Sequence, residues 1–122
     1  MDPMARRTDP DCLFCSIVAG DIPATVVRED EATVAFRDLD PQAPTHVLVV
    51  PRRHVPTVGA LALEAPGEVA PLIAAVAAVA VDEGVAEAGY RSVFNTGRQA
   101  QQSVFHAHVH VLGGRPMTWP PG

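Results

Sequence analysis

The sequence predicts an α+β domain built on a mainly antiparallel sheet. About five short runs of β-branched and apolar residues are joined by connections of hairpin length, and helical patterns interrupt them only twice. One run repeats with a period of two, which is the period of a strand, and one alanine-rich segment has the three-to-four spacing of a helix. Strands joined mostly to their neighbours in sequence favour an antiparallel sheet with helices packed on it.

Length and charge limit the class of protein further. A chain of 122 residues is long enough for one domain with its own core. Its net charge of −5 argues against a general nucleic-acid binder. No apolar run is long enough for a membrane span, and no signal-peptide core is found near the start. We therefore expect a flexible N-terminal tail over residues 1–11, a single domain over 12–122, and a cytoplasmic location.

The first element expected is a short helix that begins at a C-x-x-C motif, Cys12 to Cys15, and stops at Gly20. The chain has no second C-x-x-C motif. This one is therefore half of a zinc site completed by histidine ligands, a redox pair, or a coincidence. The redox interpretation is weakened because no thioredoxin-like strand precedes the motif.

The middle of the chain predicts a hairpin and a buried strand. Residues 26–27 and 33–36 form strand patterns on either side of a polar turn. A turn-rich loop over 38–44 leads into an apolar strand over 46–50, which ends at Pro51. The basic segment 52–54 then leaves the sheet.

The second half predicts one long helix and two strands. The alanine-rich segment 66–88 carries an apolar stripe at helical spacing, with Gly89 near its end. A strand over 91–95 and a polar loop over 96–103 lead to a histidine-rich strand over 106–112.

That last strand carries the main functional signal. Its alternation turns three imidazoles to one face: His106, His108 and His110. The opposite face is expected to point to the core, through Phe105, Ala107, Val109 and Val111. Imidazoles are costly to crowd and titrate near neutral pH, so the spacing indicates either a metal site or a nucleophilic site that handles phosphate. A catalytic zinc is disfavoured, because three ligands in line do not converge tetrahedrally and no nearby carboxylate follows the motif as a base.

Residues 102–116 resemble the signature of the histidine-triad (HIT) family, His-φ-His-φ-His-φ-φ with φ apolar. The likeness is greatest to the Hint branch, the nucleoside phosphoramidate hydrolases, and stretches at 22–24, 36–38, 41–46 and 119–122 extend it over nearly the whole chain after residue 11. The resemblance implies a HIT-like fold: a five-stranded antiparallel sheet with one long and one or two short helices. It also implies a homodimer with a continuous ten-stranded sheet.

The implied activity is hydrolysis of purine nucleoside 5′-phosphoramidates or acyl-adenylates (AMP-X) through a nucleotidyl-histidine intermediate on His108. This chemistry needs an in-line nucleophile, charge stabilisation on phosphate oxygens and a proton for the leaving group, but no cofactor. By resemblance, the catalytic residues are His108, His110, His106, His46 and Ser103. The residues expected to bind the nucleotide are Leu13, Phe14, Ile17, Phe36, Asp38, Leu39, Asn95, Ser103, His108 and His110.

The resemblance also bears on the cysteines. In bacterial relatives the C-x-x-C motif is similar to a structural zinc site completed by two histidines, and the set here is Cys12, Cys15, His54 and His106. Two positions depart from the Hint pattern. Gln101 stands where a glycine is frequent, and Arg37 stands where a histidine is common.

Two other functions remain open. One is a dinucleoside polyphosphate hydrolase of the same family, although the ending Trp119-Pro120-Pro121-Gly122 favours the phosphoramidate branch. The other is a nucleotide-binding regulatory protein, although the complete triad and Ser103 argue for retained activity. The expected partners are a purine nucleotide and a second copy of the chain, with no nucleic acid and no membrane.

Overall fold

An apolar run in the first half of the chain forms the central strand, β3 (Thr45–Pro51), and all of its residues are buried. β-branched side chains on both faces suit a strand that is covered on both sides. The computed structural model describes residues 6–122, and its five strands follow the order β1-β2-β3-β5-β4 with every neighbouring pair antiparallel. The predicted α+β class and antiparallel sheet are confirmed.

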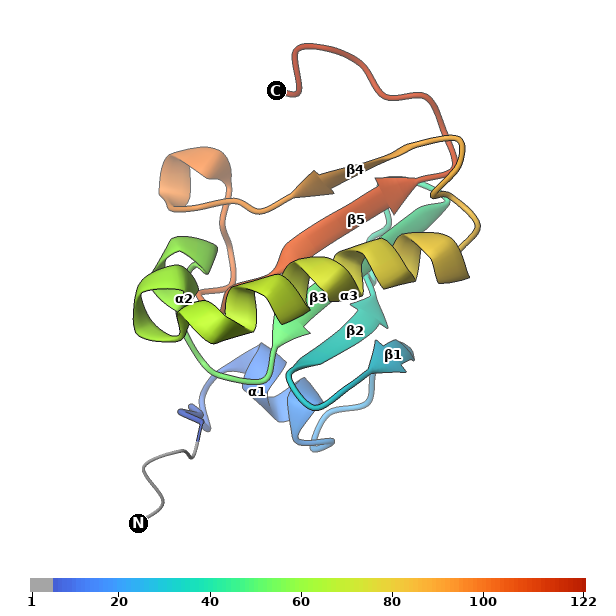
Figure 1. Ribbon diagram of the computed structural model, residues 1–122. Helices are drawn as coiled ribbons and strands as arrows, with labels where there is room; N and C mark the ends of the chain where they lie inside the picture. The colour runs from blue at the N-terminus through green and yellow to red at the C-terminus, as the bar shows by residue number, and fades with distance from the viewer. Residues whose placement is uncertain (1–5) are drawn as a thin grey trace.

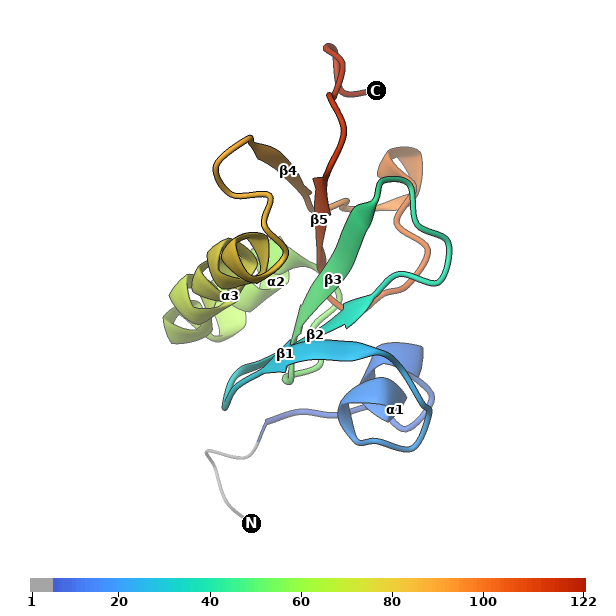
Figure 2. The same cartoon turned by 90° about the vertical axis from the view of Figure 1, so that its right-hand side faces the viewer.

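The other strands are β1 (Val26–Glu29), β2 (Thr33–Arg37), β4 (Tyr90–Val93) and β5 (Val109–Gly113). The helices are α1 (Leu13–Val18), α2 (Val58–Glu64) and α3 (Val69–Asp82), with short 3₁₀ turns at Pro66–Glu68 and Arg98–Ala100. Helices α2 and α3 lie on one face of the sheet and α1 on the other, as Figures 1 and 2 show from two directions.

Strand alternation divides the core into two layers. On the α3 side, Val47 and Val49 of β3 join Val109 and Val111 of β5 in the larger apolar cluster. On the α1 side, the neighbouring positions of β3 pack with Phe14 in a smaller cluster. The smaller cluster covers only part of its face, and His46 and His110 lie on the rest of that face.

The long helix is shorter than predicted, because it ends at Asp82 rather than near residue 88. Gly84 has φ of +73°, and its N–H donates to the carbonyl of Val81. The N–H of Val85 donates to the carbonyl of Ala80, which completes a Schellman termination. The prediction overlooked Gly84 and placed the end at the next glycine.

The histidine strand also differs from its prediction at one end. Regular pairing begins at Val109 rather than at His106, although Ala107 keeps its core position. Phe105 was expected in the core and is 57% exposed. The chain bends at residues 104–106, so the period of two does not continue back to Phe105.

Smaller differences concern the ends of elements and the N-terminus. Helix α2 was not predicted; it begins at the N-cap Thr57, whose hydroxyl accepts the N–H of Ala60 at 3.0 Å. Of the expected tail, residues 1–5 lie outside the described residues. The next residues pack on the domain, where the carbonyl of Arg7 accepts the N–H of His54 at 2.7 Å. No helix in the described part of the chain is long and apolar enough to cross a membrane.

Candidate functional site

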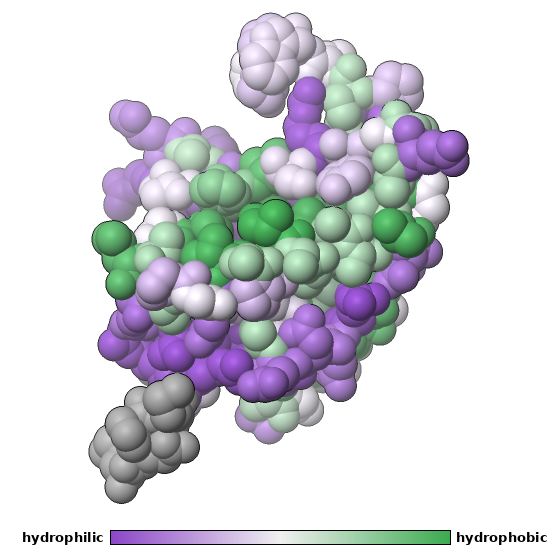
Figure 3. Space-filling model, viewed as in Figure 1, coloured by the Kyte–Doolittle hydropathy of each residue, from purple (hydrophilic) through white to green (hydrophobic). Residues whose placement is uncertain are grey.

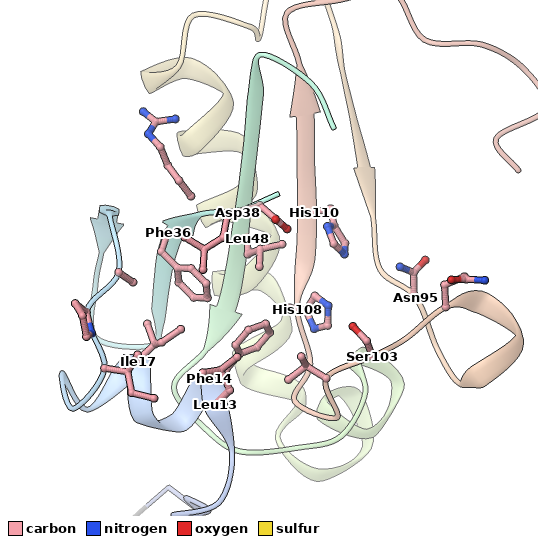
Figure 4. Close-up of a pocket in the computed structure, with 17 residues that line it drawn as sticks. Leu13, Phe14, Ile17, Phe36, Asp38, Leu48, Asn95, Ser103, His108 and His110 are labelled. Carbon is pink, nitrogen blue, oxygen red and sulfur yellow. The ribbon is translucent and has the colours of Figure 1, made fainter. Parts of the chain in front are cut away.

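A cavity of about 300 Å³ opens on the α1 side of the sheet, between α1, the end of β2 and the start of β5 (Figure 4). Its walls include every side chain that the sequence predicted to bind a nucleotide: Leu13, Phe14, Ile17, Phe36, Asp38, Leu39, Asn95, Ser103, His108 and His110. Their positions span residues 13 to 110, so the fold gathers distant segments around one space.

The cavity has an apolar end and a polar end. Phe14 packs edge-on against Phe36 at 5.4 Å between ring centroids, and edge-on against His108 at 5.1 Å. Asn95 and Ser103 lie on the side of His108 away from Phe14, and Asp38 lies beside His110 (Figure 4). Leu39 borders the opening but is 99% exposed, so it contributes little to the apolar end. The further lining residues are Ile22, Pro23, Ala24, Arg37, Leu48, Gln101 and Val104.

The backbone fixes the tautomer of His108. Its Nδ1 lies 2.7 Å from the carbonyl oxygen of His106, and because a carbonyl only accepts, Nδ1 carries the proton. In the neutral ring Nε2 is then unprotonated, on a side chain that lines the cavity. An imidazole held in this form presents a lone pair and can act as a nucleophile.

His46 and His110 form a second ordered pair. The N–H of Gln42 donates to Nδ1 of His46 at 3.0 Å, so the proton of neutral His46 is on Nε2. That Nε2 lies 2.9 Å from Nδ1 of His110 and 3.5 Å from a carboxylate oxygen of Asp38. His110 accepts at Nδ1 and therefore carries its own proton on Nε2.

Burial keeps this pair neutral. It lowers the pKa of His46, against the opposing charges of Asp38 and Asp40. Burial, together with the neighbouring imidazoles His108 and His46, lowers the pKa of His110 to about 4. The pair can therefore supply one N–H to the cavity without carrying a charge at neutral pH.

Gln102, which the sequence analysis did not single out, holds the loop that carries Ser103. Its side chain is buried, accepts the N–H of Gly97 at 2.9 Å, and donates to the carbonyls of Pro56 and Val104. No spacing or motif marks this residue, because its role depends on how the loop folds back on itself.

Gln101 adopts the backbone conformation of a glycine. Its φ is +68°, and it is the one non-glycine residue with positive φ in the described part of the chain. A side chain in this region costs about 1 kcal/mol or more relative to glycine. The structure thus accounts for the frequent glycine of the Hint pattern, and shows that Gln101 is accommodated with strain at the rim of the cavity.

A second cluster lies beside the cavity, where Cys12, Cys15, His54 and His106 bring their ligand atoms within 4.8 Å of one another. Three sulfur-to-nitrogen distances are 3.4–3.5 Å: Cys12 to His106, Cys15 to His54, and Cys15 to His106. The two Nδ1 atoms are 3.2 Å apart. Ordinary zinc bond lengths at tetrahedral angles place such atoms about 3.5 Å and about 3.3 Å apart. The four side chains therefore fit one tetrahedral ion.

The surroundings of this cluster also suit a metal ion. His106 donates from Nε2 to the carbonyl of Pro51 at 2.8 Å, which leaves the lone pair of Nδ1 facing the cluster. Burial lowers the pKa of His106 to about 4 and favours the neutral ligand form. The sulfur of Cys12 accepts the N–H of Cys15, and the sulfur of Cys15 accepts the N–H of Asp9, both at 3.4 Å. Burial raises the pKa of the Cys15 thiol, an effect that a bound cation opposes.

The three triad rings do not converge on one point. His106 faces the cysteines, His108 hydrogen-bonds to the backbone, and His110 faces His46. Asp38, His46 and His110 also gather within 4.8 Å, but the N–H from Gln42 directs the N–H of His46, rather than a lone pair, toward the centre of that group. This geometry favours a hydrogen-bonded relay at His46 and His110, and a metal ion at the cysteine cluster.

Fold and site together define a small α+β domain with an ordered imidazole cluster at the mouth of an apolar cavity. The chain belongs to the HIT domain family, whose model matches residues 19–117. It is 42% identical to the purine nucleoside phosphoramidase of Escherichia coli, over 93% of this chain and 92% of that protein. It is 46% identical to a 14 kDa zinc-binding protein of Zea mays, over 98% of this chain and 94% of that protein. A HIT family hydrolase from Legionella pneumophila superposes with a TM-score of 0.87 at 48% identity, over 92% and 100% of the two chains.

Proposed function

We propose that this protein hydrolyses purine nucleoside 5′-phosphoramidates or acyl-adenylates through a nucleotidyl intermediate on His108. The observation that carries the proposal is the hydrogen bond from Nδ1 of His108 to the carbonyl of His106. It holds the ring in the tautomer that has a free lone pair on Nε2. The relative from Escherichia coli, which is named for this activity, supports the substrate class.

In the first step, Nε2 of His108 forms a bond to phosphorus as the bond between phosphorus and the leaving group breaks. The anionic phosphate bound beside His110 favours the protonated ring, and this imidazolium gives its Nε2 proton to the leaving amine, which departs with the bonding electron pair. His46 donates to Nδ1 of His110 in the ground state and orients that ring. In the second step, water attacks phosphorus, returns a proton to His110, and releases the nucleoside monophosphate and His108.

The rest of the cavity suits the nucleotide. We assign the purine base to the apolar end beside Phe14 and Phe36, where the ring edges form a slot. Asp38 binds the ribose hydroxyls, which matches a carboxylate at the boundary between the apolar and polar ends. Asn95 and Ser103 donate to the phosphate oxygens near His108.

The test uses an adenosine 5′-phosphoramidate with a fluorescent amine as leaving group, on wild type and His108→Ala. We expect the variant to lose several orders of magnitude in kcat/KM and to retain nucleotide binding. A diadenosine triphosphate competitor separates the two hydrolase functions, since preferred cleavage of that compound would favour the alternative. Binding without turnover of either compound would favour a regulatory protein.

We further propose that the cysteine cluster holds a structural zinc ion through Cys12, Cys15, His54 and His106. When bound, zinc cross-links α1 to the segments that follow β3 and precede β5. The tetrahedral spacing and the named zinc-binding relative support this assignment. Elemental analysis should give one zinc per chain, and Cys15→Ser should lose zinc and lower Tm. A wild-type protein with no zinc, whose Tm a chelator leaves unchanged, contradicts the assignment.

We also propose that the chain forms a homodimer through the free edge of β4 and the adjoining surface of α3. β4 ends the strand order, and the neighbouring Phe94 is 50% exposed. Figure 3 shows apolar surface across the face that α3 covers, where Ile73 and Val81 are exposed. Sedimentation equilibrium should give twice the mass of one chain, whereas a monomer at micromolar concentration contradicts the proposal.

A further inference from the structure

A second groove, of about 350 Å³, opens on the same face of the sheet as the histidines. His110 and Asn95 line both this groove and the nucleotide cavity, so the two spaces adjoin at the imidazole relay. His108 lines the nucleotide cavity but not the groove. A group that leaves phosphorus on the His110 side of the cavity therefore enters this groove.

The strand register places an arginine beyond His110. Val93 of β4 pairs with His110, and Arg91 pairs with Leu112. Arg91 is thus one step further along the same face, and diagonal neighbours of this kind lie roughly 7–8 Å apart. A long guanidinium side chain spans such a distance, so Arg91 can reach a small group bonded to a phosphorus atom near His110.

The charges in the groove are unbalanced. Six arginines of the chain have a carboxylate oxygen at 3.9 Å or less: Arg6, Arg7, Arg28, Arg37, Arg52 and Arg53. Of the other three, Arg91 and Arg115 line the groove, and neither has a carboxylate partner among residues 6–122. No aspartate or glutamate of the described residues lines it. Two uncompensated positive charges therefore meet in one groove of a protein with net charge −5.

Both guanidinium groups keep free donors. Arg91 donates one N–H to the carbonyl of Thr118 at 2.8 Å. Arg115 donates to the carbonyls of Gln42 and Pro116, each at 3.1 Å. A guanidinium has five N–H donors, and these contacts fix each group while leaving several donors for a ligand. Arginine binds carboxylates and phosphates well because its planar fork matches their paired oxygens.

We propose that this groove is the leaving-group subsite, and that it selects leaving groups which carry a carboxylate or phosphate close to the scissile bond. The inference rests on the proposed function and adds the chemical class of the group that departs. In a nucleotidyl amino acid joined through its α-nitrogen, the free carboxylate lies two bonds beyond the departing nitrogen. That carboxylate enters the groove as the bond from phosphorus to nitrogen breaks.

The exit on the other side of the cavity suits an anion less well. A separate groove there shares Ser103 with the cavity, and its lining includes Arg7 together with Asp9 and Asp11. Arg7 is paired with Glu64 at 2.8 Å. The two aspartates give that exit a negative charge, so an anionic leaving group is repelled there and attracted to the side of Arg91 and Arg115.

The experiment compares adenosine 5′-phosphoramidates of alanine, with a free carboxylate, and of alaninamide, which is neutral. The enzymes are wild type, Arg91→Gln, Arg115→Gln and the matched control Arg98→Gln, which removes an arginine that lines neither cavity. The readout is the ratio of kcat/KM for alanine over alaninamide. Dividing each variant's ratio by the wild-type ratio removes the intrinsic difference between the two amines and any general loss of activity.

We expect the ratio to fall about tenfold in Arg91→Gln and in Arg115→Gln, as for a lost charge-assisted hydrogen bond. The control should keep the wild-type ratio. A parallel measurement takes the ratio of kcat/KM for diadenosine triphosphate over alaninamide and shows which anion the groove binds. A fall confined to this ratio assigns a phosphate, and a fall confined to the ratio for alanine assigns a carboxylate. An unchanged ratio for both anionic substrates, or an equal fall in the control, overturns the inference. If wild type cleaves none of the three compounds, the proposed function fails and the subsite falls with it.

Discussion

Acid should destabilise the protein through His110, and the size of the effect follows from its surroundings. Burial and the neighbouring imidazoles hold the pKa of His110 at about 4, against an ordinary value of about 6.5 in the unfolded chain. Well above pH 6.5, His110 is neutral in both the folded and the unfolded chain, so its titration takes nothing from the stability. As pH falls toward 4, the unfolded chain takes up the proton first, so the free energy of unfolding decreases.

The gap between the two pKa values corresponds to about 3 kcal/mol. Because the ring of His110 borders an open cavity, solvent screens part of this difference. We therefore expect His110 to lower the free energy of unfolding by about 2 kcal/mol between pH 7 and pH 4. Urea unfolding of wild type and of His110→Asn at both pH values gives the loss of unfolding free energy on acidification for each protein. Subtracting one loss from the other cancels the pH-independent cost of the substitution. Equal pH dependence in the two proteins would refute the argument that the relay is held neutral by burial.

Three substitutions test other parts of the structure. Leu61→Ala, at a fully buried position of α2, should lower the free energy of unfolding in urea by about 2–5 kcal/mol and leave KM unchanged. A loss below about 1 kcal/mol would contradict the assigned packing. Gln101→Gly should raise the free energy of unfolding by about 0.5–1 kcal/mol, because relief of the left-handed backbone exceeds the added chain entropy, whereas destabilisation would contradict it. Phe14→Ala should raise the Kd for AMP about tenfold in calorimetry by removing the edge contact of the base slot, and unchanged affinity would place the base elsewhere.

Local patterns predicted most of the fold. The period of two over residues 106–112 and the helical stripe of α3 both follow from backbone geometry, and both elements form, although the strand begins only at Val109. Errors arose where one residue decides a boundary. Gly84 ends α3 through a positive φ, and a bend before Ala107 turns Phe105 to solvent.

The arrangement of the site needed the tertiary structure. The contact between His46 and His110 joins residues 64 apart, and it depends on the register of β3 against β5. The hydrogen bond that sets the tautomer of His108 comes from a backbone carbonyl, which no residue type encodes. Arg91 reaches the same face as His110 through the register of β4, so the groove beside the relay has no sequence signature.

The central claim is that His108 attacks phosphorus and that water acts only in a second displacement. The most direct measurement is the stereochemistry at phosphorus, with a single diastereomer of an adenosine 5′-phosphorothioamidate hydrolysed in ¹⁸O-labelled water. Two successive in-line displacements predict retention of configuration in the labelled adenosine 5′-phosphorothioate. Inversion would mean that water attacks the substrate directly, and it would contradict a covalent intermediate on His108.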